Sequence, residues 1–126
     1  MHENTAFKGT RRGDGLDYAK WVFCEEPGLA EGIFQTAFEL MIDARLAPYA
    51  AIGLHWHHRT EEIYYLLEGS IRMVTVGADG KEHGEQLQAG DAHAVLIGQG
   101  HYGRAGGDGA RFLAVSIRKP HGATDD

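Results

Sequence analysis

Residues 55–62 read HWHHRTEE. In a β-strand, side chains two positions apart point to the same face, so His55 and His57 project together while Trp56 points the other way. The four residues between His57 and Glu62 allow the chain to reverse before Glu62 enters the next strand. This spacing places one carboxylate where it can meet two imidazoles across neighbouring strands.

A further nitrogen donor, His101, directly follows the glycine-rich turn at residues 98–100. A β-barrel can bring such distant strands together around one interior point. Three neutral imidazoles and one carboxylate suit a borderline first-row ion such as Fe, Ni, Cu, Zn or Mn. We therefore predict that His55, His57, Glu62 and His101 bind one divalent transition metal ion.

The rest of the chain has turn-forming residues spaced as in an all-β protein. Gly, Pro and Asp signals separate short apolar runs at roughly 8–12-residue spacing, and no window of helical length keeps an apolar period of 3.6 residues. We expect a type I′ hairpin turn at Ala78-Asp79-Gly80, a strand end at Glu68-Gly69, and a mobile loop at Gly103–Gly109. The expected strands cover residues 19–24, 33–43, 46–57, 63–67, 71–76, 85–87, 93–97 and 112–118.

Composition excludes several classes of protein. The 126 residues suit one domain, and 43% hydrophobic against 24% charged residues is too apolar for disorder. The net charge of −6, with Lys8, Arg11 and Arg12 as the only basic cluster, argues against nucleic-acid or membrane partners as the main function. A lone Cys24 cannot form an internal disulfide, and the polar N-terminus is not a secretory signal. A cytoplasmic location is the expectation.

The sequence also predicts how the chain is divided. We predict an N-terminal arm at residues 1–17, a single barrel domain at residues 18–120 and a C-terminal tail at residues 121–126. The long apolar alternation at residues 33–42 and the exposed edges of a small barrel favour pairing with a second copy. A homodimer whose interface includes the N-terminal segment is therefore expected.

Two motifs resemble those of the cupin superfamily. The first is His55-x-His57-x4-Glu62-x6-Gly69, and the second is Gly90-x5-Leu96-x-Gly98-x2-His101. The resemblance implies a double-stranded β-helix (jelly-roll) barrel that holds the metal ion inside and often assembles as a homodimer. The chain departs from the motifs at Tyr49, where glycine is usual, at Leu96 instead of proline, and at Ala105 instead of asparagine.

The predicted centre is suited to catalysis. Four protein ligands on an octahedral ion leave two positions open for a small molecule. The leading interpretation is a dioxygenase-like oxidoreductase in which a small organic substrate chelates Fe(II), the favoured ion. A non-redox lyase or isomerase is the alternative enzyme class, because Glu62-x-Tyr64 resembles the cupin lyases that cleave dimethylsulfoniopropionate. A non-catalytic metal- or ligand-binding cupin is the third reading.

Other residues carry secondary roles in this reading. Tyr64 and Tyr102 flank the ligands and could be acid–base groups or aromatic packing residues. His93 either lines the barrel interior near the substrate or is a buried, hydrogen-bonded histidine. His58 has the wrong strand parity for a ligand, and Glu61 competes with Glu62 for the carboxylate position. We interpret His2, His83 and His121 as ordinary surface histidines.

Overall fold

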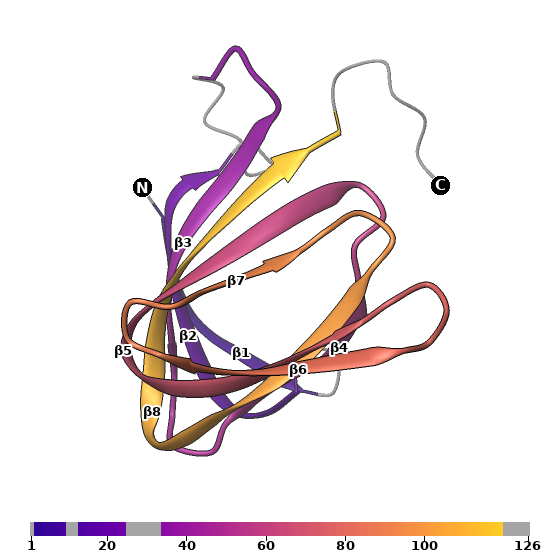
Figure 1. Ribbon diagram of the computed structural model, residues 1–126. Helices are drawn as coiled ribbons and strands as arrows, with labels where there is room; N and C mark the ends of the chain where they lie inside the picture. Colours follow the sequence, from indigo (N-terminus) through magenta and orange to yellow (C-terminus); the bar gives the residue numbers. More distant parts are fainter. Residues whose placement is uncertain (1, 10–12, 25–33, 120–126) are drawn as a thin grey trace.

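The computed structural model describes residues 2–9, 13–24 and 34–119 and builds them into eight strands without a helix (Figure 1). The prediction of an all-β jelly-roll barrel is confirmed. No helix in the described part of the chain is long and apolar enough to cross a membrane. The strands are β1 (His2–Gly9), β2 (Gly13–Cys24), β3 (Phe38–Leu46), β4 (Ala51–Trp56), β5 (Thr60–Val76), β6 (Glu82–Gln88), β7 (Ala92–Val95) and β8 (Gly100–Arg118).

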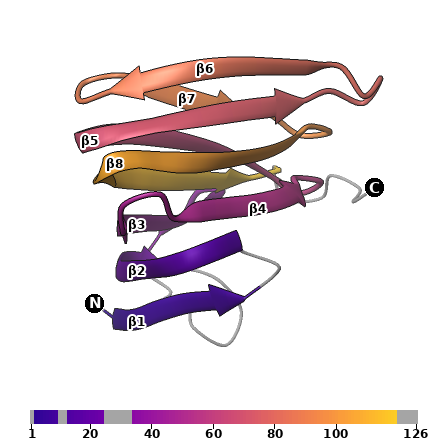
Figure 2. The same cartoon turned by 90° about the horizontal axis from the view of Figure 1, so that it is seen from below.

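Two long antiparallel strands, β5 and β8, belong to both layers of the barrel. Residues 100–105 of β8 pair with β4 and with residues 71–76 of β5, while residues 110–118 pair with β3 and with residues 60–69 of β5. The same two halves of β5 pair with β6 and β7, respectively. Figure 2 shows β4, β8, β5 and β6 stacked as one layer, with β7 and β3 behind them. The interior therefore lies between the two halves of the same strands.

Glycines make the bends in the two long strands possible. Gly69 has a φ of +78°, and a Cβ there would collide with the carbonyl oxygen of Gly109, itself at a φ of +71°. The register of β5 against β8 shifts on both sides of Gly69, which is the signature of β-bulges. The predicted strand end at Glu68-Gly69 is thus wrong, because β5 bends there and continues.

The glycine-rich segment Gly103–Gly109 also differs from the expectation. The sequence predicts a mobile loop here, but the segment lies inside β8. A Cβ on Gly103 would collide with the Met73 sulfur and lie 2.8 Å from the carbonyl oxygen of Arg72. These glycines are therefore sites of close approach between strands, a role for which glycine in a strand is typical.

The core fills the space between the layers. Its members come from alternate positions of β5 and β8 and from the strands that face them, as the period of two requires. Leu66, Ile71 and Met73 are at most 1% exposed. The buried apolar residues of this cluster are Leu46, Ala50, Ile52, Tyr64, Leu66, Ile71, Met73, Leu87, Ala105, Ala110, Phe112 and Ala114.

The hairpin turn and the terminal segments can also be compared with the predictions. The hairpin between β5 and β6 forms, but its turn is not type I′, because Gly80 has a positive φ and Asp79 does not. The segment expected as an N-terminal arm contains β1 and the start of β2, which extend the sheet beside β3. The proposed division between arm and barrel stays a prediction, and the tail at residues 121–126 lies outside the described residues.

Candidate metal centre

The four predicted ligands meet at one point inside the barrel. One donor atom from each of His55, His57, Glu62 and His101 lies within 4.8 Å of the others. The Nε2 atom of His101 is 2.9 Å from Nε2 of His55 and 3.2 Å from Nε2 of His57. Oε1 of Glu62 lies 3.7 Å from the His101 nitrogen and 3.8 Å from the His57 nitrogen. The group fits a divalent metal ion.

Strand pairing and one turn bring these residues together. His55 on β4 and His101 on β8 are directly paired. The turn before β8 is held against His57, whose amide donates to the carbonyl of Gln99 at 2.9 Å and whose carbonyl accepts from the amide of Gly98 at 2.7 Å. Residues 44 positions apart in the chain, His57 and His101, thus reach the same cluster.

Two of the histidines are oriented by neighbouring polar groups. Nδ1 of His55 lies 2.8 Å from the carbonyl oxygen of Gly53, which can only accept, so this nitrogen donates and Nε2 keeps its lone pair. Nδ1 of His57 lies 3.1 Å from Oγ1 of Thr60. Both contacts direct the Nε2 atoms towards the centre of the cluster.

The carboxylate is oriented in the same way. Ser116 donates its hydroxyl to Oε2 of Glu62 at 3.1 Å, which leaves Oε1 for the cluster. Ser116 faces Glu62 as its direct partner in the β5–β8 ladder and is 3% exposed. This geometry supports Glu62 rather than Glu61 as the ligand, because the Glu61 side chain is exposed on the opposite face of β5.

His93, a candidate from the sequence, lies directly behind His101. Its Nε2 is 3.1 Å from Nδ1 of His101, and its own Nδ1 is 3.3 Å from Oε1 of Glu85 on β6. His93 is 2% exposed and His101 is fully buried. The structure thus connects His93 with the cluster through a ligand rather than as a fifth donor.

Burial favours the neutral form of His101 and His93. Burial, together with the neighbouring His55, His57 and His93, lowers the pKa of His101 to about 2. Burial also lowers the pKa of His93, although Glu85 opposes this shift. Neutral imidazole is the form that ligates a metal, and a cation would relieve the crowding of nitrogen lone pairs at the centre.

The two tyrosine candidates lie in different places. Tyr64 is 6% exposed, and its ring lies 5.3 Å from that of His101 and is stacked on Phe112 at 4.5 Å. Tyr102 points to the opposite face of β8 from His101 and donates its hydroxyl to Glu82, which raises the pKa of Tyr102. The expectation that Tyr102 flanks the ion is therefore not supported by its position, whereas Tyr64 lies inside the barrel.

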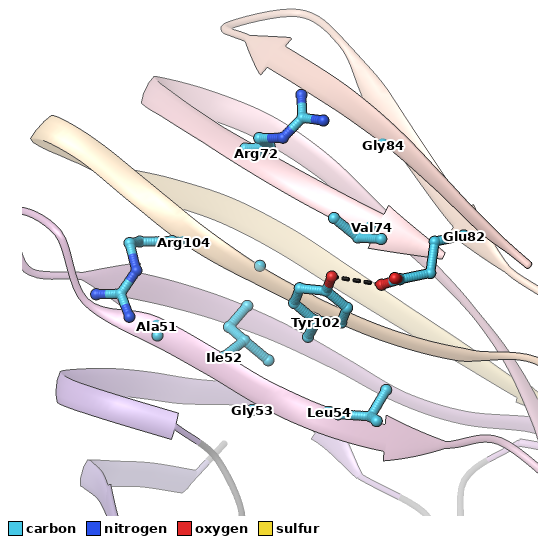
Figure 3. A pocket seen from close by; sticks show the side chains of 11 residues that line it. Ala51, Ile52, Gly53, Leu54, Arg72, Val74, Glu82, Gly84, Tyr102 and Arg104 are labelled. Carbon is cyan, nitrogen blue, oxygen red and sulfur yellow. Dashed lines mark hydrogen bonds between the residues drawn. The ribbon is translucent and has the colours of Figure 1, made fainter. Parts of the chain in front are cut away.

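Tyr102 lines a hollow of about 710 Å³ on the outside of the barrel, over β4, β8, β5 and β6 (Figure 3). Leu54, Arg72, Glu82 and Arg104 also line this hollow. None of the four cluster residues lies in it. The centre is therefore assigned from the convergence of its donor atoms, and the outer hollow is a separate feature.

Sequence reasoning missed the groups that orient the ligands. Thr60 lies in the quoted stretch, three residues after His57, but an ordinary threonine gives no signal of its role. Ser116 and Glu85 are far away in the chain and reach the site only through strand pairing. His83 is exposed, in agreement with its expected surface position, and His58 is exposed, in agreement with its exclusion from the ligands.

A family model for cupins matches residues 36–125, well over half of the chain. The chain belongs to the cupin family. Both motifs that suggested the resemblance lie within the matched region. No curated protein matches this cupin.

Solved structures agree with this assignment. A predicted oxalate decarboxylase from Thermotoga maritima is 25% identical with a TM-score of 0.72, and the match covers 94% of this cupin and 93% of that chain. A mutant of the Bacillus subtilis oxalate decarboxylase OxdC is 25% identical with a TM-score of 0.67, over 94% of this cupin but only 29% of that chain. KdgF from Halomonas sp., at 16% identity and a TM-score of 0.62, covers 83% of this cupin and 81% of its own length and supports the fold alone.

Proposed function

We propose that this cupin is a metal-dependent enzyme that acts on a small organic acid held at the ion. The observation that carries the proposal is the convergence of three imidazole Nε2 atoms and Oε1 of Glu62 inside the barrel. A divalent ion bound there would polarise a carboxylate or enolate oxygen as a Lewis acid. The Glu62 side chain keeps 13% of its surface exposed.

The reaction class that we propose is non-oxidative cleavage of such an acid. Two of the similar structures carry the name oxalate decarboxylase, an activity that breaks a carbon–carbon bond in a small dicarboxylate. The buried ring of Tyr64 lies 5.3 Å from that of His101, which supports Tyr64 as the group that would donate or accept a proton. This support reverses the order expected from the sequence, which favoured an oxygenase.

Fe(II)-dependent oxygenation is the second candidate, and the donor set is compatible with it. Three neutral imidazoles and one carboxylate would leave a six-coordinate divalent ion with a net charge near +1 and two open positions, enough for a substrate and dioxygen. The two reactions make different demands, because only the oxygenase consumes dioxygen. A binding protein without turnover would show neither activity.

The test is a set of single-metal preparations assayed on one substrate panel. The metal-free protein is loaded separately with Mn²⁺, Fe²⁺, Co²⁺ and Zn²⁺ and mixed with small mono- and dicarboxylates, enolizable acids and catechols. Release of carbon dioxide or an elimination product without oxygen uptake supports the lyase proposal. Oxygen uptake with Fe²⁺ alone would replace it by the oxygenase, and binding without turnover would contradict both.

A matched pair of variants ties any activity to the centre. His57→Ala removes one ligand and should lose both metal and turnover, whereas His83→Ala removes an exposed histidine and should change neither. A His57→Ala variant that retains both its full metal content and full activity would refute the site assignment. Loss of metal with activity intact would make the ion structural.

We also propose a homodimer in the cytoplasm. Phe23, Phe34 and Phe38 form an aromatic cluster with ring centroids 4.4 to 6.5 Å apart, although Phe23 is 37% exposed and Phe34 36% exposed. Exposed apolar clusters are typical of interaction surfaces. Light scattering at micromolar concentration should give twice the chain mass, and a monomer mass would contradict the proposal.

A further inference from the structure

A chain of two side chains runs from the metal centre to the edge of the barrel. His93 on β7 lies behind His101, and the two rings are nearly parallel, at 10° with centroids 5.3 Å apart. Nε2 of His93 is 3.1 Å from Nδ1 of His101. On the other side of the ring, Nδ1 of His93 is 3.3 Å from Oε1 of Glu85, whose side chain is 38% exposed.

The chemistry of the carboxylate gives this chain a direction. An ionised carboxylate has no hydrogen to donate, so Glu85 must accept and Nδ1 of His93 must carry the proton. A neutral imidazole has only one N–H, so Nε2 of His93 is left as an acceptor. That acceptor requires a donor at Nδ1 of His101, which leaves Nε2 of His101 with a free lone pair that faces the other ligands.

We propose that Glu85, acting through His93, holds His101 in the tautomer that ligates the ion, so that both are positioning residues of the metal centre. This inference rests on the metal site of the proposed function and adds the groups that prepare it. For His55, the backbone carbonyl of Gly53 fixes the tautomer in the same way, because it accepts a hydrogen bond from Nδ1. Partners of this kind, which fix the tautomer and orientation of a ligating histidine, typically change metal affinity about 10- to 100-fold.

Four variants separate hydrogen bonding from packing. His93→Leu removes the acceptor for His101 but fills much of the same volume. His93→Gln keeps an acceptor for His101 and a donor for Glu85. Glu85→Lys replaces an acceptor by a donor and so favours the reversed chain, in which Nε2 of His101 would carry a proton. Glu82→Lys makes the same change of charge on β6 but at a residue that points to the outer hollow.

Zinc affinity is the first measurement, made on the full chain by competition with a chromophoric chelator at constant pH. His93→Leu and Glu85→Lys should each weaken binding by about 10-fold or more, in the range of tautomer-fixing partners. His93→Gln and Glu82→Lys should stay within about threefold of the unchanged protein. Equal loss in the Gln and Leu variants, or no loss in either His93→Leu or Glu85→Lys, would overturn the proposal.

Nitrogen NMR of the zinc-loaded protein is the second measurement and does not depend on any variant folding. Two-bond ¹H–¹⁵N correlations should show His93 protonated at Nδ1 and unprotonated at Nε2. The opposite tautomer would overturn the proposal. Failure of the unchanged protein to bind zinc would instead refute the metal centre itself, whereas tight binding that is indifferent to His93 and Glu85 refutes only this inference.

Discussion

His55 and His101 are directly paired residues of β4 and β8, and their Nε2 atoms lie 2.9 Å apart. One extra residue in β4 makes this possible, because Ile52 pairs with Gly103 while His55, three positions on, pairs with His101. The bulge turns both Ile52 and His55 to the interior, where strict alternation would separate them. The metal centre therefore depends on a local irregularity of the sheet.

The choice of carboxylate is directly testable. Glu62→Gln keeps the size of the side chain but removes the charge that a divalent ion needs, so zinc affinity should fall by more than about 100-fold, beyond the range typical of outer partners. Glu61→Gln, on the exposed face of β5, should leave affinity unchanged. Chelator competition measures both. A larger loss of zinc affinity in Glu61→Gln than in Glu62→Gln would make Glu61 the ligand.

The buried imidazoles make the metal-free protein sensitive to acid. His101 has a pKa of about 2 in the folded protein and a value near 6.5 when unfolded, so the unfolded state binds more protons between these limits. The free energy of unfolding should therefore fall as the pH drops below about 6.5, by up to about 1.4 kcal/mol per pH unit from this residue.

Urea unfolding of the metal-free protein between pH 7.5 and 5 measures this slope. His101→Gln should flatten the slope by the equivalent of one proton, while His83→Gln, at an exposed position, should keep it. A stability that does not change with pH over this range would show that His101 is readily protonated in the folded state.

The two tyrosines should behave differently on substitution by phenylalanine. Tyr64→Phe removes the hydroxyl of a buried ring that lies beside His101 and should lower turnover by about 100-fold if the phenol moves a proton, with zinc affinity little changed. Tyr102→Phe breaks only the contact with Glu82 on the outer face and should leave turnover within about twofold. The same loss in both variants would contradict the assignment of faces. Steady-state kinetics on the best substrate decide the comparison.

Tyr49 has a φ of 61°, a left-handed conformation that is strained for a side chain with a Cβ. This is the position at which the cupin motif usually has glycine. Tyr49→Gly should raise the free energy of unfolding by up to about 1 kcal/mol, because the tyrosine is 65% exposed and little packing is lost. Tyr49→Ala keeps the strain and should be less stable than Tyr49→Gly. Thermal unfolding in which alanine is the more stable would refute this reading of the backbone.

The close approach of β5 and β8 can be tested with two glycines of similar φ. Gly69 and Gly80 have φ values of +78° and +80°, but a Cβ collides with Gly109 only at Gly69, while Gly80 has open space. Gly80→Ala should cost about 1 kcal/mol from backbone strain alone, and Gly69→Ala several kcal/mol, since backbone would have to move. Equal destabilisation would mean that the bulge is not tightly packed.

Much of the site could be predicted from residues 55–62 and the turn before His101. The shared face of His55 and His57 follows from the alternation of a single strand, which neighbouring residues determine. Glu62 follows from the short reversal after His57. The strand boundaries were harder, because glycines that usually end strands here sit inside β5 and β8.

The amino-acid sequence alone determined the donor set, the all-β class and the turns that deliver His101, because each depends on residue type and short spacing. Only the tertiary structure decided that Gly69 and Gly109 lie at an irregularity of the β5–β8 ladder. It also decided that Tyr102 faces outward, and that Ser116 and Glu85 reach the centre. These features depend on the register between strands that are far apart in the chain. Register is set by which side chains the whole barrel can bury, and no local pattern contains that information.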